Sequence, residues 1–189
     1  MTRGSPQPTL SDGSIWIDLR GIQEGTHSLV LDGREAALVV EEEADRVLRG
    51  FRFDGEVAWD GRDYRVRGSL TGDLESACDR CLARFVRPVT GEVEFRAVPP
   101  DSPEGAEAAP GEAIVLLGAE RRLDLAGPLR GAVLLELPIK SLCRDDCAGI
   151  CPVCGINRNL ESCDCEPSSG DPRWEALRGV SFPKDQEEE

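Results

Sequence analysis

The chain is poor in histidine, lysine and aromatic residues, with one His, two Lys and 5% Phe, Trp and Tyr among 189 residues. His27 has no metal-ligand spacing around it, so we interpret it as a surface residue. A catalytic zinc site needs an open coordination position and usually a His or carboxylate ligand. No Ser/His/Asp or Cys/His arrangement, phosphate-binding loop or glycine-rich dinucleotide motif is present. We therefore predict that the protein is not an enzyme and has no small-molecule substrate.

Long apolar runs and an excess of positive charge are also absent. The longest runs, near Ala113–Gly118 and Ala132–Leu135, are too short to cross a bilayer, and residues 1–13 contain no apolar segment of the signal-peptide kind. The formal net charge of −14 does not attract a phosphate backbone. Arginine outnumbers lysine 20 to 2, which we interpret as codon bias of a GC-rich genome. We expect a cytoplasmic protein without a membrane partner.

The chain does contain eight cysteines. Thiols stay reduced in the cytosol, so clustered cysteines indicate metal binding before disulfides. Two form a C-x2-C motif, and six follow as C-x3-C-x3-C-x2-C-x8-C-x-C. The predicted metal ligands are Cys78, Cys81, Cys143, Cys147, Cys151, Cys154, Cys163 and Cys165.

Four thiolates around one ion make a closed tetrahedral zinc site, and a C-x2-C turn supplies two of them from one tight loop. We predict two structural zinc ions, because each site then uses two local pairs of cysteines. One alternative joins the two middle pairs and leaves Cys163 and Cys165 without metal. Others are a [2Fe–2S] cluster or a redox dithiol, although a redox C-x2-C motif normally opens a helix inside a βαβ unit. The assigned sets are Cys78, Cys81, Cys143 and Cys147, and Cys151, Cys154, Cys163 and Cys165.

From residue 51 onward, apolar and polar side chains alternate with the period of a half-buried strand. Asp60-Gly61 is a strong hairpin signal, because Gly accepts the positive φ of a primed turn. A third strand over Phe85–Val98 would complete an antiparallel meander, with the C-x2-C motif at its second bend. The residues predicted to point inward are Phe51, Phe53, Val57, Trp59, Tyr64, Val66, Gly68, Leu70, Phe85, Val89, Val93, Phe95 and Ala97.

Shorter signals predict the remaining elements. Residues 34–50 fit either a strand entering a turn or a short helix. Asp124 can cap a helix over Leu125–Leu137, and Asp171-Pro172 precedes a short helix over Arg173–Gly179. Further strands are expected at Ile15–Leu19, Thr26–Leu31, Ala113–Leu117 and Arg121–Leu123.

Together these elements predict an α+β fold: a β-rich antiparallel meander or barrel-like sheet, one or two helices and a cysteine-rich zinc-binding segment. Residues 99–112 carry four prolines and four acids without a large apolar residue, so we expect a disordered loop there. The predicted divisions are a disordered N-terminus at 1–13, a β-rich domain with a helix at 14–137, a zinc segment with a short helix at 138–180, and an acidic tail at 181–189.

Four segments carry a family resemblance: ACDRCL at 77–82, LPIKSLC at 137–143, CAGICPVCGINRNLESCDC at 147–165 and DPRWEAL at 171–177. In this ordered combination the chain resembles the YceD family of bacterial and plastid proteins, known as large ribosomal RNA subunit accumulation protein. The resemblance implies a role in synthesis, processing or stability of the 23S ribosomal RNA, without known catalytic activity. A zinc-containing interaction adaptor outside ribosome assembly is the alternative, and a dithiol redox protein is a further one.

An RNA role would need a local basic patch. Between Arg46 and Arg96 there are ten arginines and nine acids, so this region is much less acidic than the rest of the chain. Its arginines can either pair with nearby carboxylates and balance anionic zinc–thiolate sites, or form a small docking patch for large-subunit RNA or a ribosomal protein. The overall acidity favours a basic ribosomal protein or an assembly intermediate over naked RNA. The candidate docking residues are Arg52, Arg65, Arg67, Arg80, Arg84 and Arg87.

Overall fold

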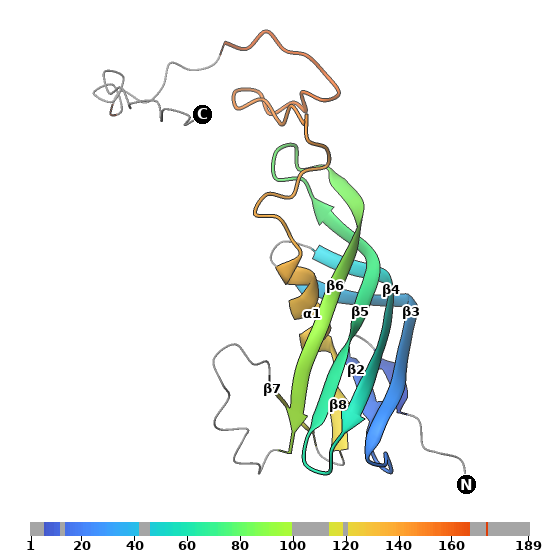
Figure 1. The fold of residues 1–189 in the computed structure, drawn as a ribbon. Coiled ribbons are helices and arrows are strands. Elements are labelled where there is room, and N and C mark those ends of the chain that lie inside the picture. Colours follow the sequence, from blue (N-terminus) through green and yellow to red (C-terminus); the bar gives the residue numbers. More distant parts are fainter. Residues whose placement is uncertain are drawn as a thin grey trace, which may run out of the picture.

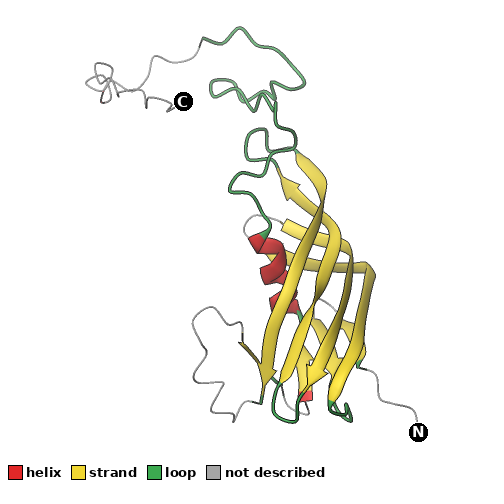
Figure 2. Cartoon of the chain, in the orientation of Figure 1, coloured by secondary structure: helices red, strands yellow, loops and turns green. Residues whose placement is uncertain are grey.

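The computed structural model describes residues 6–11, 14–41, 46–99, 114–118, 121–166 and 173. Within these ranges, long antiparallel strands dominate and one α-helix packs against them (Figure 1). This confirms the predicted β-rich α+β class with a cysteine-rich segment. Figure 2 shows that the segment after the helix is almost entirely loop, so its shape depends on side-chain and turn contacts rather than on regular structure.

The larger sheet has five strands in the order β3-β4-β5-β6-β7. Neighbours from β3 to β6 pair antiparallel, as the alternation predicts, whereas the short β7 joins β6 in parallel. The sheet is open, because its first and last strands do not pair, so the barrel-like form is not adopted. The strands are β3 (Gly25–Glu41), β4 (Arg46–Trp59), β5 (Tyr64–Ala77), β6 (Arg84–Val98) and β7 (Ile114–Leu116).

The ambiguous segment 34–50 belongs to strands β3 and β4 rather than to a helix. The expected strand Thr26–Leu31 is only the first part of β3, which continues to Glu41. The pairing register with β4 shifts between Gly33 and Ala37, as it does where a β-bulge inserts extra residues into one strand. Because a bulge breaks the period-2 alternation, the sequence pattern alone does not reveal the full length of β3.

A second, smaller sheet contains three short strands in the order β1-β2-β8. β2 (Ser14–Asp18) and β8 (Arg122–Asp124) lie within one residue of the predicted strands. β1 (Gln7–Ser11) lies where the sequence predicts disorder, and it pairs antiparallel with β2. Strand pairing uses backbone N–H and C=O groups, so a polar segment can join a sheet without an apolar pattern.

The helix α1 (Ala126–Leu135) packs against β3 and β6 of the larger sheet and β2 of the smaller one. It is shorter than the predicted Leu125–Leu137. Asp124 still contributes to its start, because its carboxylate accepts a hydrogen bond of 2.9 Å from the Ala126 N–H. Leu129 and Val133 bury their side chains in the core shared by both sheets. The helix therefore closes one side of the core and delivers the chain to the cysteine-rich segment.

Most residues predicted to point inward are buried in that core. Trp59 and Gly68 are half-buried, and Phe85 packs against cysteines rather than in the main core. Gly68 has a steric role, since a Cβ atom there would lie 2.7 Å from the Phe53 ring. Its neighbour across the strands, Gly55, leaves room for the same ring. The glycine pair thus allows a large aromatic side chain to lie flat on the sheet.

The cysteine-rich segment runs from α1 toward the turn between β5 and β6, at the end of the larger sheet opposite β2 and β8 (Figure 1). Among the described residues, no helix combines the length and apolar character that crossing a membrane requires. Several predictions lie outside the described residues: the loop beyond Pro99, the first residue of the strand Ala113–Leu117, the short helix beyond Arg173, and the tail at 181–189.

Candidate metal centre

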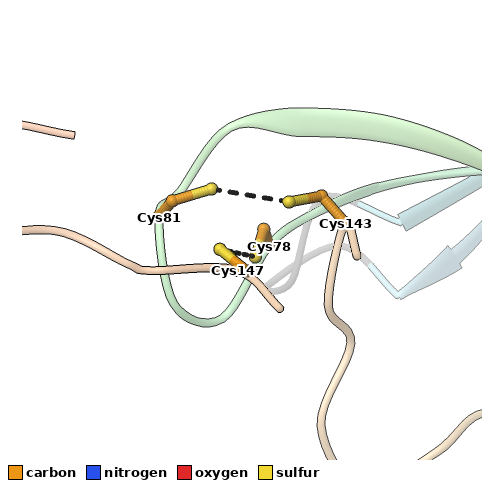
Figure 3. Close-up of side chains that lie close together, drawn as sticks. All are labelled: Cys78, Cys81, Cys143 and Cys147. Carbon is orange, nitrogen blue, oxygen red and sulfur yellow. Dashed lines mark hydrogen bonds between the residues drawn. The ribbon is translucent and has the colours of Figure 1, made fainter. Parts of the chain in front are cut away.

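The first cysteine group consists of Cys78, Cys81, Cys143 and Cys147. Two of these residues lie in the turn between β5 and β6. The other two lie in the cysteine-rich segment after α1, residues 136–166, which we call the loop segment (Figure 3). The Sγ atoms of Cys78 and Cys147 are 3.8 Å apart, and those of Cys81 and Cys143 are also 3.8 Å apart. All but Cys143 are buried. The group thus joins two parts of the chain that are distant in sequence.

The second cysteine group consists of Cys151, Cys154, Cys163 and Cys165, all within the loop segment. In each of the two groups, the four Sγ atoms lie within 4.8 Å of one another. Cys151 is buried, whereas Cys154 is exposed. The structure therefore brings the cysteines together in the two sets that the sequence predicts, and not in the alternative that joins the two middle pairs.

Each group has the dimensions of a site for a single ion. With metal–sulfur bonds of about 2.3 Å, tetrahedral coordination separates the sulfur atoms by about 3.8 Å. The two sulfur–sulfur distances in the first cysteine group match this value. All eight cysteines are free thiols rather than disulfides. Each group could therefore hold one metal ion.

In the first cysteine group, the surroundings favour one thiolate and oppose another. Burial raises the pKa of the Cys78 thiol, but three nearby backbone N–H groups, that of Cys143 foremost, lower it to about 6 overall. Burial, followed by the neighbouring thiols, raises the pKa of Cys143 to about 12. Burial likewise raises the pKa of Cys147, but hydrogen bonds from the Asn159 side chain, from the Gly149 N–H and with the neighbouring thiols together outweigh burial, so the net change is a decrease.

The second cysteine group repeats this pattern. Backbone N–H groups of Cys154 and Val153 lower the pKa of the Cys151 thiol to about 6. A hydrogen bond with the Cys154 thiol, together with burial, raises the pKa of Cys165 to about 12. Neighbouring thiolates repel one another, so four of them ionise together only around a cation. This is the chemistry expected of a set of metal ligands.

The two C-x2-C turns have the same backbone shape. The Leu82 N–H donates to the Cys78 carbonyl at 2.9 Å, and the Gly155 N–H donates to the Cys151 carbonyl at 2.9 Å. The residue after the second cysteine has a positive φ in both turns, 60° at Leu82 and 78° at Gly155. Glycine is the residue that adopts this conformation without strain. The sequence therefore indicates the turn at Gly155, whereas the same turn at Leu82 is visible only in the structure.

Hydrogen bonds between protein groups also fasten the first turn to the loop segment. The Asp79 carboxylate accepts a hydrogen bond from the Ser141 N–H at 2.6 Å, and the Asp79 N–H donates to the Ser141 carbonyl at 2.9 Å. The Arg80 side chain donates to the carbonyl oxygen of Cys147 at 3.0 Å. Sequence reasoning missed Asp79 and Ser141, and their only signal is a polar residue beside or near a cysteine. These contacts therefore help to position the four thiols of the first cysteine group.

The candidate docking arginines lie in two places. Three project from the solvent-facing side of the larger sheet and three lie in or near the turn between β5 and β6. Several form ion pairs, at 2.6 Å with Asp54, 2.6 Å with Glu56 and 3.8 Å with Glu75. Pairing with nearby carboxylates is one of the two interpretations that the sequence allows, and the docking role stays a prediction. The paired arginines are Arg52, Arg67 and Arg84, respectively.

The fold and the two groups define a class of protein: an open antiparallel sheet with one helix, joined at its end to a loop segment that could hold two metal ions. A family model described as large ribosomal RNA subunit accumulation protein YceD matches residues 66–180. This is more than half of the chain, and the chain belongs to the YceD family. The matched residues include all eight cysteines.

Curated relatives match parts of the chain. An uncharacterised protein of Mycobacterium tuberculosis is 34% identical over 116 residues, covering 59% of this chain and 53% of the relative. One of Mycobacterium leprae is 30% identical over 99 residues, covering 52% and 45%. The maize chloroplast protein named large ribosomal RNA subunit accumulation protein YCED homolog 1 is 34% identical over 50 residues, covering 26% and 17%. The chain thus spans about half the length of the mycobacterial relatives. No solved structure matches.

Proposed function

We propose that the protein is a non-enzymatic, zinc-stabilised factor that promotes accumulation of the large-subunit 23S ribosomal RNA, through its synthesis, processing or stability. The observation that carries the proposal is the family match over residues 66–180. The description of the family and the name of the maize relative both refer to large-subunit ribosomal RNA. The described residues support a scaffold role. Their two groups of four cysteines are suited to closed metal sites, which hold a fold together.

Zinc is the ion proposed for both cysteine groups. Four thiolates at tetrahedral spacing are the usual ligand set of structural zinc in a reducing compartment. When bound, each ion would neutralise part of the thiolate charge and hold the four ligands at fixed distances. In the first cysteine group, that would fix the loop segment to the turn between β5 and β6. Native mass spectrometry should find two zinc ions per chain, and a [2Fe–2S] cluster would instead give iron and a coloured protein.

A protein partner is proposed in preference to naked RNA. The formal net charge is −14, and each zinc site with four thiolates carries a charge of about −2. Arg52 and Arg67, on the solvent-facing side of the larger sheet, are already paired with carboxylates. Complementary charge then favours a basic ribosomal protein or an assembly intermediate, met in the cytoplasm.

The test is a ribosomal-subunit profile of cells depleted of this protein, with 23S and 16S RNA quantified in each gradient fraction. We expect 23S RNA to fall relative to 16S RNA and to recover when the wild-type chain is re-expressed. Cys78→Ser should fail to restore the ratio, because it opens the first cysteine group. Ser162→Ala, an exposed change in the same loop segment, is the matched control and should restore it.

An unchanged ratio of 23S to 16S RNA after depletion would contradict the proposal. It would favour the alternative, a zinc-containing adaptor that acts outside ribosome assembly, and proteins that co-purify with the chain would then identify the process. Turnover of a substrate that survives metal removal but is lost in Cys78→Ser would instead indicate an enzyme.

A further inference from the structure

Asn159 lies in the sequence between cysteines of the second group, but its side chain contacts the first group. It lies in the loop between Cys154 and Cys163, two ligands of the second group. Its side-chain Nδ2 donates to the Sγ atom of Cys147, a member of the first group, at 3.3 Å. Its Oδ1 accepts hydrogen bonds from the Ala148 N–H at 2.8 Å and from the Arg144 guanidinium at 2.7 Å. One amide side chain thus contacts the Cys147 thiol and two residues close to it in the sequence.

The orientation of the Asn159 amide is fixed by its partners. The Asn157 Oδ1 accepts hydrogen bonds from the Asn159 N–H at 3.0 Å and from its Nδ2 at 2.8 Å. A flipped amide would turn its oxygen toward the Cys147 thiolate and toward the Asn157 oxygen, and would turn its NH2 toward the donors Ala148 N–H and Arg144. All of these contacts would be repulsive or lost. The donor therefore faces the sulfur, as metal-bound thiolates require of their neighbours.

Backbone hydrogen bonds tie the same loop to the rest of the first cysteine group. The Arg158 N–H donates to the Gly149 carbonyl at 2.9 Å, and residues Ile150 and Asn157 form an isolated bridge. The Ile150 N–H in turn donates to the Arg80 carbonyl at 3.0 Å, inside the first C-x2-C turn. A continuous chain of contacts therefore runs from the loop of the second group to both halves of the first.

We propose that Asn159 couples the two cysteine groups, so that an ion in the second group increases the affinity of the first group for its own ion. The inference rests on the proposed function insofar as it takes both groups to bind metal. An ion in the second group holds the two ends of the Cys154–Cys163 loop and so restricts the conformations of Asn159. Placing Asn159 beside Cys147 then costs less conformational entropy when the first group binds its ion. By linkage, an ion in the first group tightens the second by the same factor.

The lengths of chain between ligands set the order of binding. The ligands of the second group are close neighbours in sequence, whereas Cys81 and Cys143 of the first group are separated by 62 positions. Closing a long loop costs more conformational entropy than closing a short one. During folding, before the contacts of Asp79 with Ser141 have closed the long loop, the second group is therefore the one that binds its ion first.

The test is a titration of the full-length, metal-free, reduced chain with cadmium, a soft cation that binds thiolates. Cadmium-113 NMR gives one resonance for each group, and the resonance lost in Cys78→Ser identifies the first group. Competition with a chelator then gives an affinity for each. We expect Asn159→Ala to lower the cadmium affinity of the first group by about 10–100-fold. Asn159→Asp should lower this affinity further, because its carboxylate would face the thiolate. Ser162→Ala, in the same loop, should leave both affinities unchanged.

A double variant separates coupling from a purely local effect. Cys154→Ser/Cys163→Ser opens the second group and should weaken the first by a similar factor, and adding Asn159→Ala to it should cause little further loss. Two ions binding with a first-group affinity that Asn159→Ala leaves unchanged would overturn the coupling alone. The coupling would also be overturned if the affinity losses caused by Asn159→Ala and by Cys154→Ser/Cys163→Ser were fully additive. A wild-type chain that binds fewer than two ions would overturn the two-metal assignment as well.

Discussion

The two cysteine groups each consist of four cysteines and contain similar turns, but they have different positions in the fold. The first cysteine group is mostly buried and joins the turn between β5 and β6 to the segment that follows α1. The second is more exposed and closes on itself within one segment. The same chemistry therefore has different consequences: an ion in the first group would hold two parts of the fold together, whereas an ion in the second would shape a local loop.

The largest difference is expected when each group is opened by a single change. A cross-link that closes a loop of about 60 residues stabilises a folded chain by about 4 kcal/mol through the entropy of the unfolded state. Cys78→Ser should therefore reduce the free energy of unfolding of the zinc-loaded protein by about that amount. Cys163→Ser should change the unfolding of the sheets far less, because all its partners lie in the same loop segment. Urea denaturation followed by far-UV circular dichroism measures both.

The comparison between the groups would fail if both serine variants lost the same free energy of unfolding. It would also fail if Cys78→Ser matched the wild type, since the hydrogen bonds between Asp79 and Ser141 would then suffice to hold the loop segment. Repeating both measurements on chelator-treated protein supplies the control, because the two variants should then differ much less.

The second prediction concerns pH in the metal-free, reduced chain. Cys78 and Cys151 have folded pKa values near 6, below the usual thiol value of 9.0. Their contribution to the free energy of unfolding is therefore full above pH 9 and is lost as pH falls toward 6. Cys143 and Cys165 have folded values near 12, so their contribution is full below pH 9 and is lost as pH rises toward 12. Stability should therefore be greatest near pH 9.

Urea midpoints measured from pH 6 to pH 11 test this pH dependence. Cys78→Ser should remove the part of the stability loss between pH 9 and pH 6 that comes from the first group. Cys151→Ser should remove the part that comes from the second group. A stability that rises steadily across the whole range would contradict the pattern of two favoured and two disfavoured thiolates.

The smallest expected effect compares the two C-x2-C turns at their positive-φ residue. A non-glycine residue in this conformation is strained by about 1–2 kcal/mol, and Leu82 is 65% exposed, so little apolar burial is lost when it is shortened. Leu82→Gly should raise the free energy of unfolding by up to about 1 kcal/mol, after the entropy cost of glycine. Gly155→Ala should lower it by about 1 kcal/mol, although a Cβ atom there meets nothing within 4 Å.

Ala83→Gly is the matched control for the turn comparison. Ala83 follows Leu82 and does not have a positive φ, so glycine there adds unfolded-state entropy without relieving strain, and stability should fall slightly. A loss of stability in Leu82→Gly would show that the exposed leucine side chain makes a stabilising contact that outweighs its backbone strain.

Much of the larger sheet follows from its sequence, because alternation is a local property. Phe51, Phe53 and Val57 are buried as the period-2 pattern predicts, and Asp60-Gly61 lies at the turn between β4 and β5. The pattern is less informative where pairing is irregular or long-range. The bulged β3 conceals its own length, and the parallel pairing of β7 with β6 depends on how the chain returns to the sheet.

One glycine and one asparagine show the limits of the sequence at single residues. Gly68 fits the inward pattern, but its purpose is to accommodate the Phe53 ring, which only the packing of β4 on β5 reveals. Asn159 occurs in the family-like motif, yet its contact with Cys147 depends on how the loop folds back. Gly155 is different, because a glycine after a C-x2-C pair already indicates a backbone with positive φ.

By itself, the sequence determined the eight cysteines, their local pairs and the alternation that builds the meander, since spacing and side-chain period act over a few residues. The tertiary structure decided that the turn between β5 and β6 meets the segment after α1, that Asp79 and Ser141 fasten them, and that Asn159 reaches across to the other cysteine group. These contacts join residues far apart in the chain or across a folded loop. Their distances depend on core packing, which positions α1 and the sheet before the cysteines can come together.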